Sequence, residues 1–271
     1  MAQHKYRQLT KNIQTCHSML VAFSGGVDSA LLLKAARDTL GRDNVLAVTF
    51  HAPFHGKEEL LEVQSLAARL DCRLQVIKDS GLMDDADFCA NPPNRCYICK
   101  RTILTRLLDL AREKGLSTVA EGSNADDVRD YRPGMQAVRE LHVISPLQMA
   151  GLTKREIRKI SRDLGLPTWN KPSSPCLCSR IPYGSPITYI KLRQIEEGEK
   201  FLKEAGFSEI RLRHHGPLAR IEIPAGKMGD LINEPMLSMV QSHLRGLGFQ
   251  YVTLDLHGLR SGSLNEVLDF K

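Results

Sequence analysis

Short apolar runs alternate with longer segments of helical periodicity through the first half of the chain. The apolar runs predict buried strands at residues 18–23, 45–50, 73–77 and 118–120. The longer segments predict helices at residues 28–40, 58–70, 100–114 and 153–164. Thr153 and Glu156 form a capping box at the start of the last of these helices. Because strands that alternate with helices build βαβ units, we expect an α/β fold with a parallel sheet and helices on both faces.

The pattern changes between residues 169 and 186. This stretch holds four prolines and four serines in eighteen residues, so we expect a loop and a domain junction there. Beyond it the pattern predicts helices at 189–205 and 235–247, and strands at 209–214, 219–223 and 251–254. We therefore divide the chain into residues 1–170 and 171–271, and expect the second part to be a smaller α+β domain.

The first predicted strand runs directly into the string SGGVDS, residues 24–29, and then into a helix. Two adjacent glycines permit a tight turn whose backbone N–H groups converge on an anion, and the helix N-terminus adds partial positive charge. The hydroxyls of Ser24 and Ser29 can donate to phosphate oxygens. The Lys-Ser/Thr pair of the P-loop and the spacing of a dinucleotide fingerprint are both absent. The string is therefore a phosphate loop of another class, or an ordinary strand-to-helix turn.

Composition and charge narrow the choice of partners. The 271 residues carry a formal net charge of +6, with basic residues scattered along the chain. This mild excess suits an acidic small molecule such as a nucleotide and does not demand a nucleic acid polymer. No apolar stretch approaches ~18 residues, and the N-terminal segment lacks the apolar centre of a signal peptide. We therefore expect a cytoplasmic protein that crosses no membrane.

Seven cysteines, an odd number without a secretion signal, argue against a disulfide framework. Cys96 and Cys99 form a CxxC pair where a helix begins, and Cys176 and Cys178 lie in the proline-rich loop. Such a CxxC pair can be a redox couple, two metal ligands or two small apolar residues. The second pair of cysteines favours metal binding.

The string SGGVDS, with a strand before it and a helix after it, resembles the pyrophosphate loop of the N-type ATP pyrophosphatases. The resemblance implies a fold of the adenine nucleotide alpha hydrolase type, ATP with its pyrophosphate in the loop, Mg²⁺, and transfer of AMP to a substrate oxygen. It assigns to the nucleotide Ser24, Gly25, Gly26, Asp28 and Ser29. Glu121 and Gly122, which follow the strand at 118–120, are assigned to the same site.

Further strings resemble the LarE family, in order along nearly the whole chain. They are DYRPG (130–134), WNKP (169–172), SRIPYG (179–184), RLRH (211–214), ARIE (219–222) and YVTLDL (251–256). LarE proteins are sulfur transferases that complete the nickel-pincer nucleotide cofactor of lactate racemase. The resemblance implies adenylylation of the carboxylates of pyridinium-3,5-biscarboxylate mononucleotide, conversion of each to a thiocarboxylate, and a homo-oligomer.

The resemblance also assigns roles in the second half of the chain. Arg211 and Arg213 alternate along one predicted strand and suit a substrate phosphate, although an exposed basic strand face is the alternative. Ser179 and Arg180 would hold the activated carboxylate or the phosphate. Three acids match family positions that can hold a divalent ion, or are surface acids: Glu199, Glu222 and Asp230. Arg132 would bind phosphate or support its Pro-Gly turn.

The sulfur donor has two candidate forms. In family members that sacrifice a cysteine, the donor lies five residues before the arginine of the SRIPYG string, where this chain has Pro175. Other members hold a [4Fe–4S] cluster on three thiolates. We predict such a cluster on Cys96, Cys99 and Cys176. Cys176 also belongs to the predicted catalytic set, and Cys178 is an alternative ligand. Sulfide or a cysteine desulfurase would supply the sulfur, and a Cys₄ zinc site or no metal is the alternative.

Other functions remain open at this point. A tRNA thiolation enzyme would share the ATP chemistry and the cluster, but the modest charge and an aromatic content of 6% favour a small substrate. An amidating synthetase would not need the cysteines. A non-catalytic module that binds a metal or a nucleotide is the alternative of another class.

Overall fold

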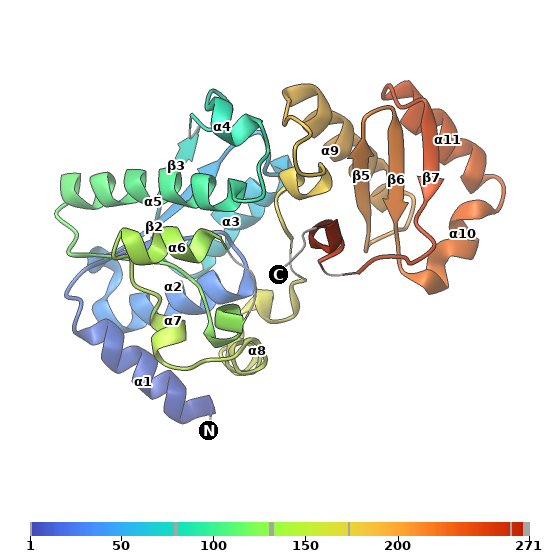
Figure 1. Ribbon diagram of the computed structural model, residues 1–271. Helices are drawn as coiled ribbons and strands as arrows, with labels where there is room; N and C mark the ends of the chain where they lie inside the picture. Colours follow the sequence, from blue (N-terminus) through green and yellow to red (C-terminus); the bar gives the residue numbers. More distant parts are fainter. Residues whose placement is uncertain (1, 79–80, 130–132, 173, 261, 268–271) are drawn as a thin grey trace. The chain divides into compact units, whose positions relative to one another are not determined.

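The computed structural model describes residues 2–78, 81–129, 133–172, 174–260 and 262–267. The chain forms two compact units. The first comprises Met1–Asp85 and Asn94–Ser174, and the second comprises Ala86–Pro93 and Pro175–Lys271. Each unit has its own sheet (Figure 1). Among the described helices, none combines the length and apolar content that a membrane crossing requires.

Four parallel strands form the sheet of the first unit, in the order β3-β2-β1-β4. Their bounds are Met19–Ala22 (β1), Val45–His51 (β2), Arg73–Lys78 (β3) and Thr118–Ala120 (β4). Met19 pairs with Val45 on one side and with Thr118 on the other. The chain therefore builds outward from β1 through β2 and β3, and then returns to place β4 beside β1.

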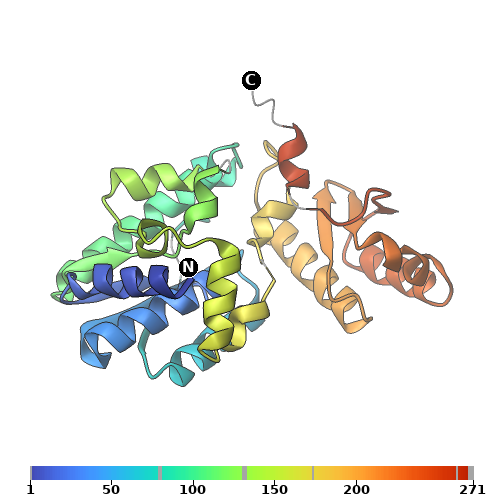
Figure 2. The same cartoon turned by 90° about the horizontal axis from the view of Figure 1, so that it is seen from below.

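Helices cover both faces of this sheet, as predicted (Figures 1 and 2). They are Ala2–Gln14 (α1), Val27–Leu40 (α2), Lys57–Arg69 (α3), Arg95–Glu113 (α5), Gly134–Glu140 (α6), Pro146–Met149 (α7) and Lys154–Asp163 (α8). Met19 and Val21 of β1 pack with residues of α1, α2 and α3, whereas Leu20 packs with residues of α5. Successive strand residues point to opposite faces, so an uninterrupted apolar strand buries both.

The predicted capping box is present at the start of α8. Thr153 Oγ1 accepts a hydrogen bond from the backbone of Glu156, and the Glu156 carboxylate accepts one from the backbone of Thr153 at 3.0 Å. The same carboxylate lies 2.7 Å from Lys5 Nζ, which joins α1 to α8. Burial alone raises the pKa of Glu156, but the Lys5 and Thr153 hydrogen bonds outweigh it and lower the pKa to about 2.

Replacement of Glu156 by glutamine tests this link. Glutamine keeps the capping hydrogen bond and removes the charge, so we expect the free energy of unfolding to fall by about 1 kcal/mol near neutral pH. The folded pKa lies below the ordinary value of 4.5, so the stabilisation is present above that value and is lost as the pH falls toward about 2. Urea unfolding at neutral pH and near pH 3 should show the wild type and Glu156→Gln converging in acid; an equal difference at both would contradict the prediction.

A mixed sheet of three strands, in the order β5-β6-β7, forms the centre of the second unit. The strands are Arg211–His215 (β5), Leu218–Glu222 (β6) and Tyr251–Leu254 (β7); β5 and β6 are antiparallel, and β6 and β7 are parallel. The helices are Ala86–Cys89 (α4), Tyr189–Glu204 (α9), Met228–Ile232 (α10) and Met236–Gly246 (α11). A Cβ on Gly198 of α9 would lie 2.4 Å from Leu212 Cδ2, so glycine lets α9 lie directly on β5. This confirms the expected smaller α+β fold.

Residues Ala86–Pro93 belong to the second unit although they lie within the first half of the sequence. Asn91 is fully buried, and its side-chain amide donates to the carbonyls of Pro182 at 2.8 Å and Ser185 at 2.9 Å. The backbone of Ile187 donates to the carbonyl of Cys89 at 2.8 Å. These hydrogen bonds fasten the short segment to the loop that precedes α9.

Candidate functional site

The candidate phosphate loop joins β1 to α2. Gly25 has a φ of 70°, and a Cβ on it would lie 2.7 Å from Val63 Cγ2 of α3, so both the backbone and the packing require glycine. Ser24 Oγ lies 3.1 Å from Ser29 Oγ, and Ser29 Oγ donates to the carbonyl of Gly26 at 3.2 Å. The loop thus places the positive end of a 14-residue helix at the carboxyl end of β1.

The end of β4 packs against the start of α2. A Cβ on Gly122 would lie 3.1 Å from the backbone nitrogen of Ser29, so glycine permits this close approach. The strand order reverses between β1 and β4. Open α/β sheets bind ligands at the carboxyl ends of the strands at such a reversal. The structure therefore brings Glu121 and Gly122 to the phosphate loop.

Glu121 is a buried carboxylate at this point, with 4% of its surface exposed. Lys100 Nζ lies 2.6 Å from Oε2, and the hydroxyls of Ser123 and Ser145 also donate to the carboxylate. Burial raises the pKa of Glu121, but Lys100 and the two hydroxyls outweigh it, so the pKa lies below its ordinary value. Lys100 directly follows Cys99, so this ion pair joins the CxxC turn of α5 to the end of β4.

Charged and polar groups that the sequence interpretation missed also reach the loop. Lys154, the first residue of α8, lies 2.5 Å from the Asp28 carboxylate, and the amide of the buried Asn124 lies 3.5 Å from the same group. Lys171 Nζ lies 3.3 Å from the carbonyl of Gly25. Asn124 could have been found from its position just after β4, and Lys171 from its place in the WNKP string. The position of Lys154 beside Asp28 depends on the packing of α8 and has no local signal.

In the second unit, Arg180 and Glu199 form a buried ion pair. Arg180 lies in the 3₁₀ turn Leu177–Arg180, and its Nε and Nη2 donate to the Glu199 carboxylate of α9 at 2.8 Å and 3.0 Å. Arg180 Nη1 also donates to the hydroxyl of Ser179 at 2.9 Å. The pair therefore fixes the turn that holds Ser179.

Arg213 of β5 and Glu222 of β6 form a second buried pair, with hydrogen bonds of 2.9 Å and 2.7 Å. Arg213 Nη1 donates to the carbonyl of Ser179 at 2.6 Å, and Ser263 Oγ bonds to both partners. Asp230, the third acid predicted to hold a divalent ion, is exposed on α10 and lies 2.9 Å from Lys227. Glu199 thus pairs with Arg180, Glu222 pairs with both Arg213 and Arg220, and the structure does not bring Asp230 to them.

Arg211 differs from Arg180, Arg213 and Arg220, each of which forms an ion pair with Glu199 or Glu222. Within the described part of the chain, no carboxylate lies within ion-pair distance of its guanidinium. Its half-buried position lowers its pKa, and the neighbouring charges of Arg180 and Arg213 lower it further. Arg211 is therefore the positive group of this cluster that is best placed to receive an anion.

The cysteines are divided between the units. Cys96 and Cys99 lie in the first turns of α5 in the first unit, and Cys176 and Cys178 lie in the second unit. In the ranges that the structure describes, no group of three or more His, Cys, Asp or Glu side chains is arranged to hold a metal ion. The predicted cluster ligands therefore stay a prediction. Arg132 lies outside the described residues.

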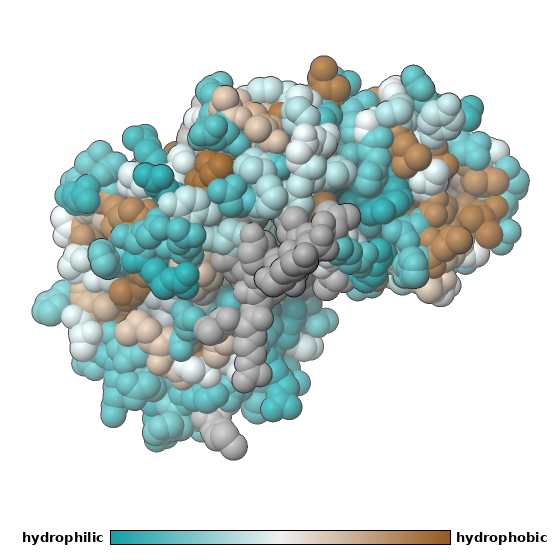
Figure 3. Space-filling view, in the orientation of Figure 1, coloured by the Kyte–Doolittle hydropathy of each residue, from teal (hydrophilic) through white to brown (hydrophobic). Residues whose placement is uncertain are grey.

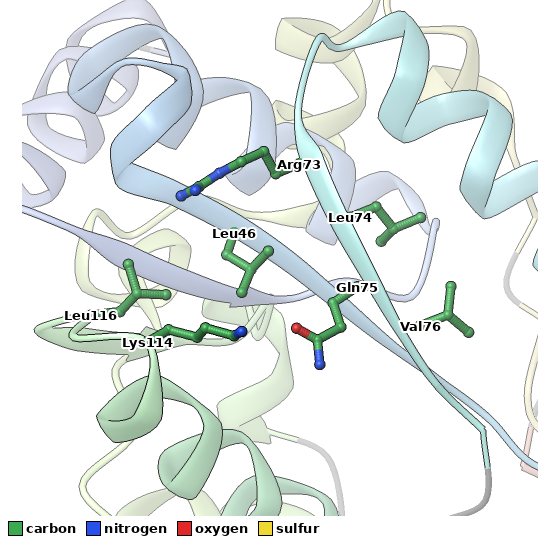
Figure 4. Close-up of a pocket in the computed structure, with 7 residues that line it drawn as sticks. All are labelled: Leu46, Arg73, Leu74, Gln75, Val76, Lys114 and Leu116. Carbon is green, nitrogen blue, oxygen red and sulfur yellow. The ribbon is translucent and has the colours of Figure 1, made fainter.

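A hollow of about 460 Å³ lies elsewhere in the first unit (Figure 4). Its walls come from the first half of β2, from β3 and from the connection between α5 and β4: Leu46, Arg73, Leu74, Gln75, Val76, Lys114 and Leu116. Figure 4 shows Gln75 and Lys114 extending toward one another. Leu46 is near the start of its strand and Leu116 precedes β4, so the hollow lies toward the amino ends of the strands, away from the phosphate loop.

Comparison with known proteins identifies what the chain is similar to. Residues 14–203 match the family model described as thiamine biosynthesis protein (ThiI). A protein from Synechocystis sp. without an assigned function is 40% identical over 99% of both chains. The pyridinium-3,5-bisthiocarboxylic acid mononucleotide synthase of Lactiplantibacillus plantarum is 39% identical over 97% of this chain and 95% of its own. The tRNA-specific 2-thiouridylase MnmA of Leptospira biflexa is 26% identical over 73% of this chain and 61% of its own.

Proposed function

The chain belongs to the thiamine biosynthesis protein (ThiI) family and to the LarE family, and from this membership we propose that it is a cytoplasmic, ATP-dependent sulfur transferase. Its substrate would be pyridinium-3,5-biscarboxylate mononucleotide, whose carboxylates it would convert to thiocarboxylates for the nickel-pincer nucleotide cofactor. The first unit, Met1–Asp85 and Asn94–Ser174, would bind and cleave ATP, and the second unit, Ala86–Pro93 and Pro175–Lys271, would bind the mononucleotide.

The geometry of the SGGVDS loop is the observation that carries this proposal. The loop lies where the strand order reverses, its Gly25 accepts no side chain, and the start of α2 lies directly behind it. Such a site suits a phosphate chain of an incoming nucleotide. The identity of 39% over 97% of the chain to a pyridinium-3,5-bisthiocarboxylic acid mononucleotide synthase supports a carboxylate of such a mononucleotide as the acceptor.

The proposed reaction has two steps. A substrate carboxylate oxygen attacks the α-phosphorus of MgATP, the bond between the α-phosphorus and the bridging oxygen breaks, and pyrophosphate leaves. Sulfide then attacks the acyl carbon, and AMP leaves with the former carboxylate oxygen. The loop and α2 would stabilise the charge that develops on pyrophosphate, and Mg²⁺ bound to its oxygens would neutralise part of the same charge.

The second unit would position the mononucleotide. Arg211 would bind its phosphate, because no carboxylate of the described residues lies within ion-pair distance of its guanidinium. Arg213 and Arg180 would act mainly by holding Ser179, the first through its carbonyl and the second through its hydroxyl. Ser179 would then donate to the activated carboxylate. Glu199 and Glu222 would maintain the two arginines in place.

For the sulfur donor we keep the [4Fe–4S] cluster as part of the proposal. Cys96, Cys99 and Cys176 would be its ligands, with Cys178 as an alternative, and soft thiolates are the ligands that such clusters use. Anaerobic purification followed by iron, sulfide and zinc determination, on the wild type and on the four single alanine variants, tests it. Zinc without iron would exclude the cluster.

ATP–pyrophosphate exchange tests the function itself. Radiolabelled pyrophosphate should enter ATP when the biscarboxylate mononucleotide is present, and AMP and thiocarboxylate should accumulate when sulfide is added. Exchange without any carboxylate substrate, or no exchange with the mononucleotide, would contradict the proposal. Neither measurement requires the sulfur donor to be known.

Arg211→Gln should weaken the binding of the mononucleotide and leave the binding of ATP unchanged. A hydrogen bond to a charged group contributes about 1.5–3 kcal/mol, so we expect KM for the mononucleotide to rise by roughly tenfold or more while the Tm changes little. The substrate without its 5′-phosphate should lose no further affinity in the variant. Arg193→Gln, which removes an exposed arginine of α9, is the matched control. An equal loss with both substrates would show that Arg211 does not bind the phosphate.

A homo-oligomer is also part of the proposal. Figure 3 shows apolar surface over the part of the second unit that carries α10 and α11. Ile232 and Met239 of these helices are 53% and 49% exposed. Apolar surface of this kind commonly marks an interface between subunits.

A further inference from the structure

Lys171 reaches the phosphate loop from a segment 146 residues later in the chain. We infer that Lys171 is a ligand of the pyrophosphate part of ATP, and that its ammonium forms an ion pair with Glu62 until the nucleotide binds. The inference rests on the proposed function, because it names a further residue of the same nucleotide site.

The loop has no cation of its own. The string SGGVDS contains no lysine or arginine, whereas a P-loop carries a lysine that reaches the outer phosphates. The nearest basic residue along α2, Lys34, forms an ion pair with Asp38. Positive side chains must therefore come from elsewhere in the fold. The structure supplies two: Lys154, which forms an ion pair with Asp28, and Lys171, whose ammonium lies beside the carbonyl of Gly25.

The backbone of Lys171 is fixed firmly. Arg158 of α8 donates to the carbonyls of Trp169 and Lys171 at 2.9 Å and 2.8 Å. The Lys171 N–H donates to the carbonyl of Thr168 at 2.9 Å. Pro172 restricts the preceding residue to an extended conformation, and Lys171 has a φ of −61° and a ψ of 126°. The position of its Cα beside the loop is thus set by the fold and not by its side chain.

The side chain, in contrast, is held by contacts that an anion can replace. Its ammonium donates to the carbonyl of Gly25 at 3.3 Å and to Glu62 of α3 at 2.7 Å. Glu62 is 60% exposed, so this ion pair contributes little stability. A pyrophosphate group carries several negative charges and offers more acceptors than one exposed carboxylate. A lysine has a flexible stem and three donors, so its ammonium can turn from Glu62 toward phosphate oxygens while the backbone stays in place.

This assignment predicts opposite effects for the two partners of the ion pair. Lys171→Met removes the ligand, so the dissociation constants of MgATP and of inorganic pyrophosphate should rise by about tenfold or more. AMP lacks the outer phosphates, so its binding should change little. Glu62→Gln removes the competing carboxylate, so pyrophosphate should bind about two- to threefold more tightly. If Lys171 only tied its segment to α3, both variants would weaken binding or neither would.

Isothermal titration of the full chain with MgATP, pyrophosphate and AMP is the experiment. Lys159→Met is the matched control, because Lys159 is an exposed lysine of α8 that pairs with Asp163, and its loss makes the same change in net charge. An unchanged Tm would show that Lys171→Met folds. Wild-type protein that binds neither MgATP nor pyrophosphate would overturn the proposed function. If the wild type binds both ligands and Lys171→Met binds them with the same affinity, this inference alone would be overturned. Weaker binding of pyrophosphate by Glu62→Gln would have the same consequence.

Discussion

Gly25→Ala should lower the affinity for MgATP by about a hundredfold or more, although the substitution removes no functional group from the site. The added methyl group would lie 2.7 Å from Val63 Cγ2, and the residue would have to keep a φ of 70° that L-residues other than glycine disfavour. The loop can relieve the collision only by moving away from α3. Its backbone donors would then leave the phosphate site. Equilibrium titration with MgATP measures the loss.

Two further variants separate the collision from the backbone strain. Gly41, at the other end of α2, has a φ of 82° and no atom within 4 Å of a Cβ, so Gly41→Ala carries the strain without the collision. Its ψ of 162° lies in a region that is essentially restricted to glycine, so the substitution should reduce stability by about 1–3 kcal/mol and leave ATP binding intact. Val63→Ala removes the methyl group that Gly25→Ala meets, so the double variant should recover at least about tenfold of the lost affinity. No recovery would mean that φ alone, and not packing on α3, excludes alanine.

The strand, loop and helix of the candidate phosphate site were predictable because their signals are local. A buried strand, two glycines and a helix follow one another in the string from Met19 to Leu40, and the structure has them in that order. The parallel sheet followed from the alternation of strands and helices. Even the capping box of α8 was present as predicted, since Thr153 and Glu156 lie three residues apart.

The helix α1 and the start of α5 were less visible. The segment Ala2–Gln14 is mostly polar, and its burial depends on Leu9 and Ile13, which lie on one face and are fully buried. Two residues are a weak periodic signal. The helix α5 begins at Arg95, five residues before the start that the periodic pattern predicted, and the CxxC pair lies in its first turns, as expected.

The features of the fold and of the candidate site that could not be predicted depend on contacts between distant segments. Asn91 joins the segment Ala86–Pro93 to carbonyls about ninety residues later, which no local pattern records. The resemblance to the LarE family made Glu199 and Glu222 candidate ligands of a divalent ion, and from the sequence alone each was a surface acid. Their pairing with Arg180 and Arg213 depends on how α9 lies on β5 and on the register of β5 with β6. Register and helix packing arise from tertiary structure, and so the charge balance of this cluster could not be foreseen.

Glu222→Gln should reduce the free energy of unfolding by about 3–5 kcal/mol, because it leaves the Arg213 guanidinium buried without its counter-ion. The side chains of the two residues are only 3% and 0% exposed. Urea unfolding followed by circular dichroism measures the loss, and amide hydrogen exchange in β5 and β6 should locate it. Asp163→Asn breaks the exposed pair with Lys159 and should cost less than about 0.5 kcal/mol. A comparably small loss in Glu222→Gln would show that this pair is not desolvated.

The double variant Arg213→Met/Glu222→Leu tests whether Arg213 positions Ser179 or binds the substrate phosphate. Replacing a buried ion pair by apolar residues of similar size is often neutral, and Arg220, which also contacts Glu222 at 3.1 Å, keeps Asp255 as a partner at 3.6 Å. The stability of the double variant should therefore return to within about 1 kcal/mol of the wild type. The double variant would still lack the hydrogen bond of 2.6 Å that Arg213 Nη1 donates to the carbonyl of Ser179 in the wild type. If Arg213 acts by holding Ser179, the stable double variant should bind the mononucleotide with nearly normal affinity and form the adenylate slowly. If Arg213 binds the substrate phosphate directly, its KM should rise as in Arg211→Gln. The ratio of kcat to KM effects in a folded protein therefore distinguishes a positioning arginine from a substrate ligand.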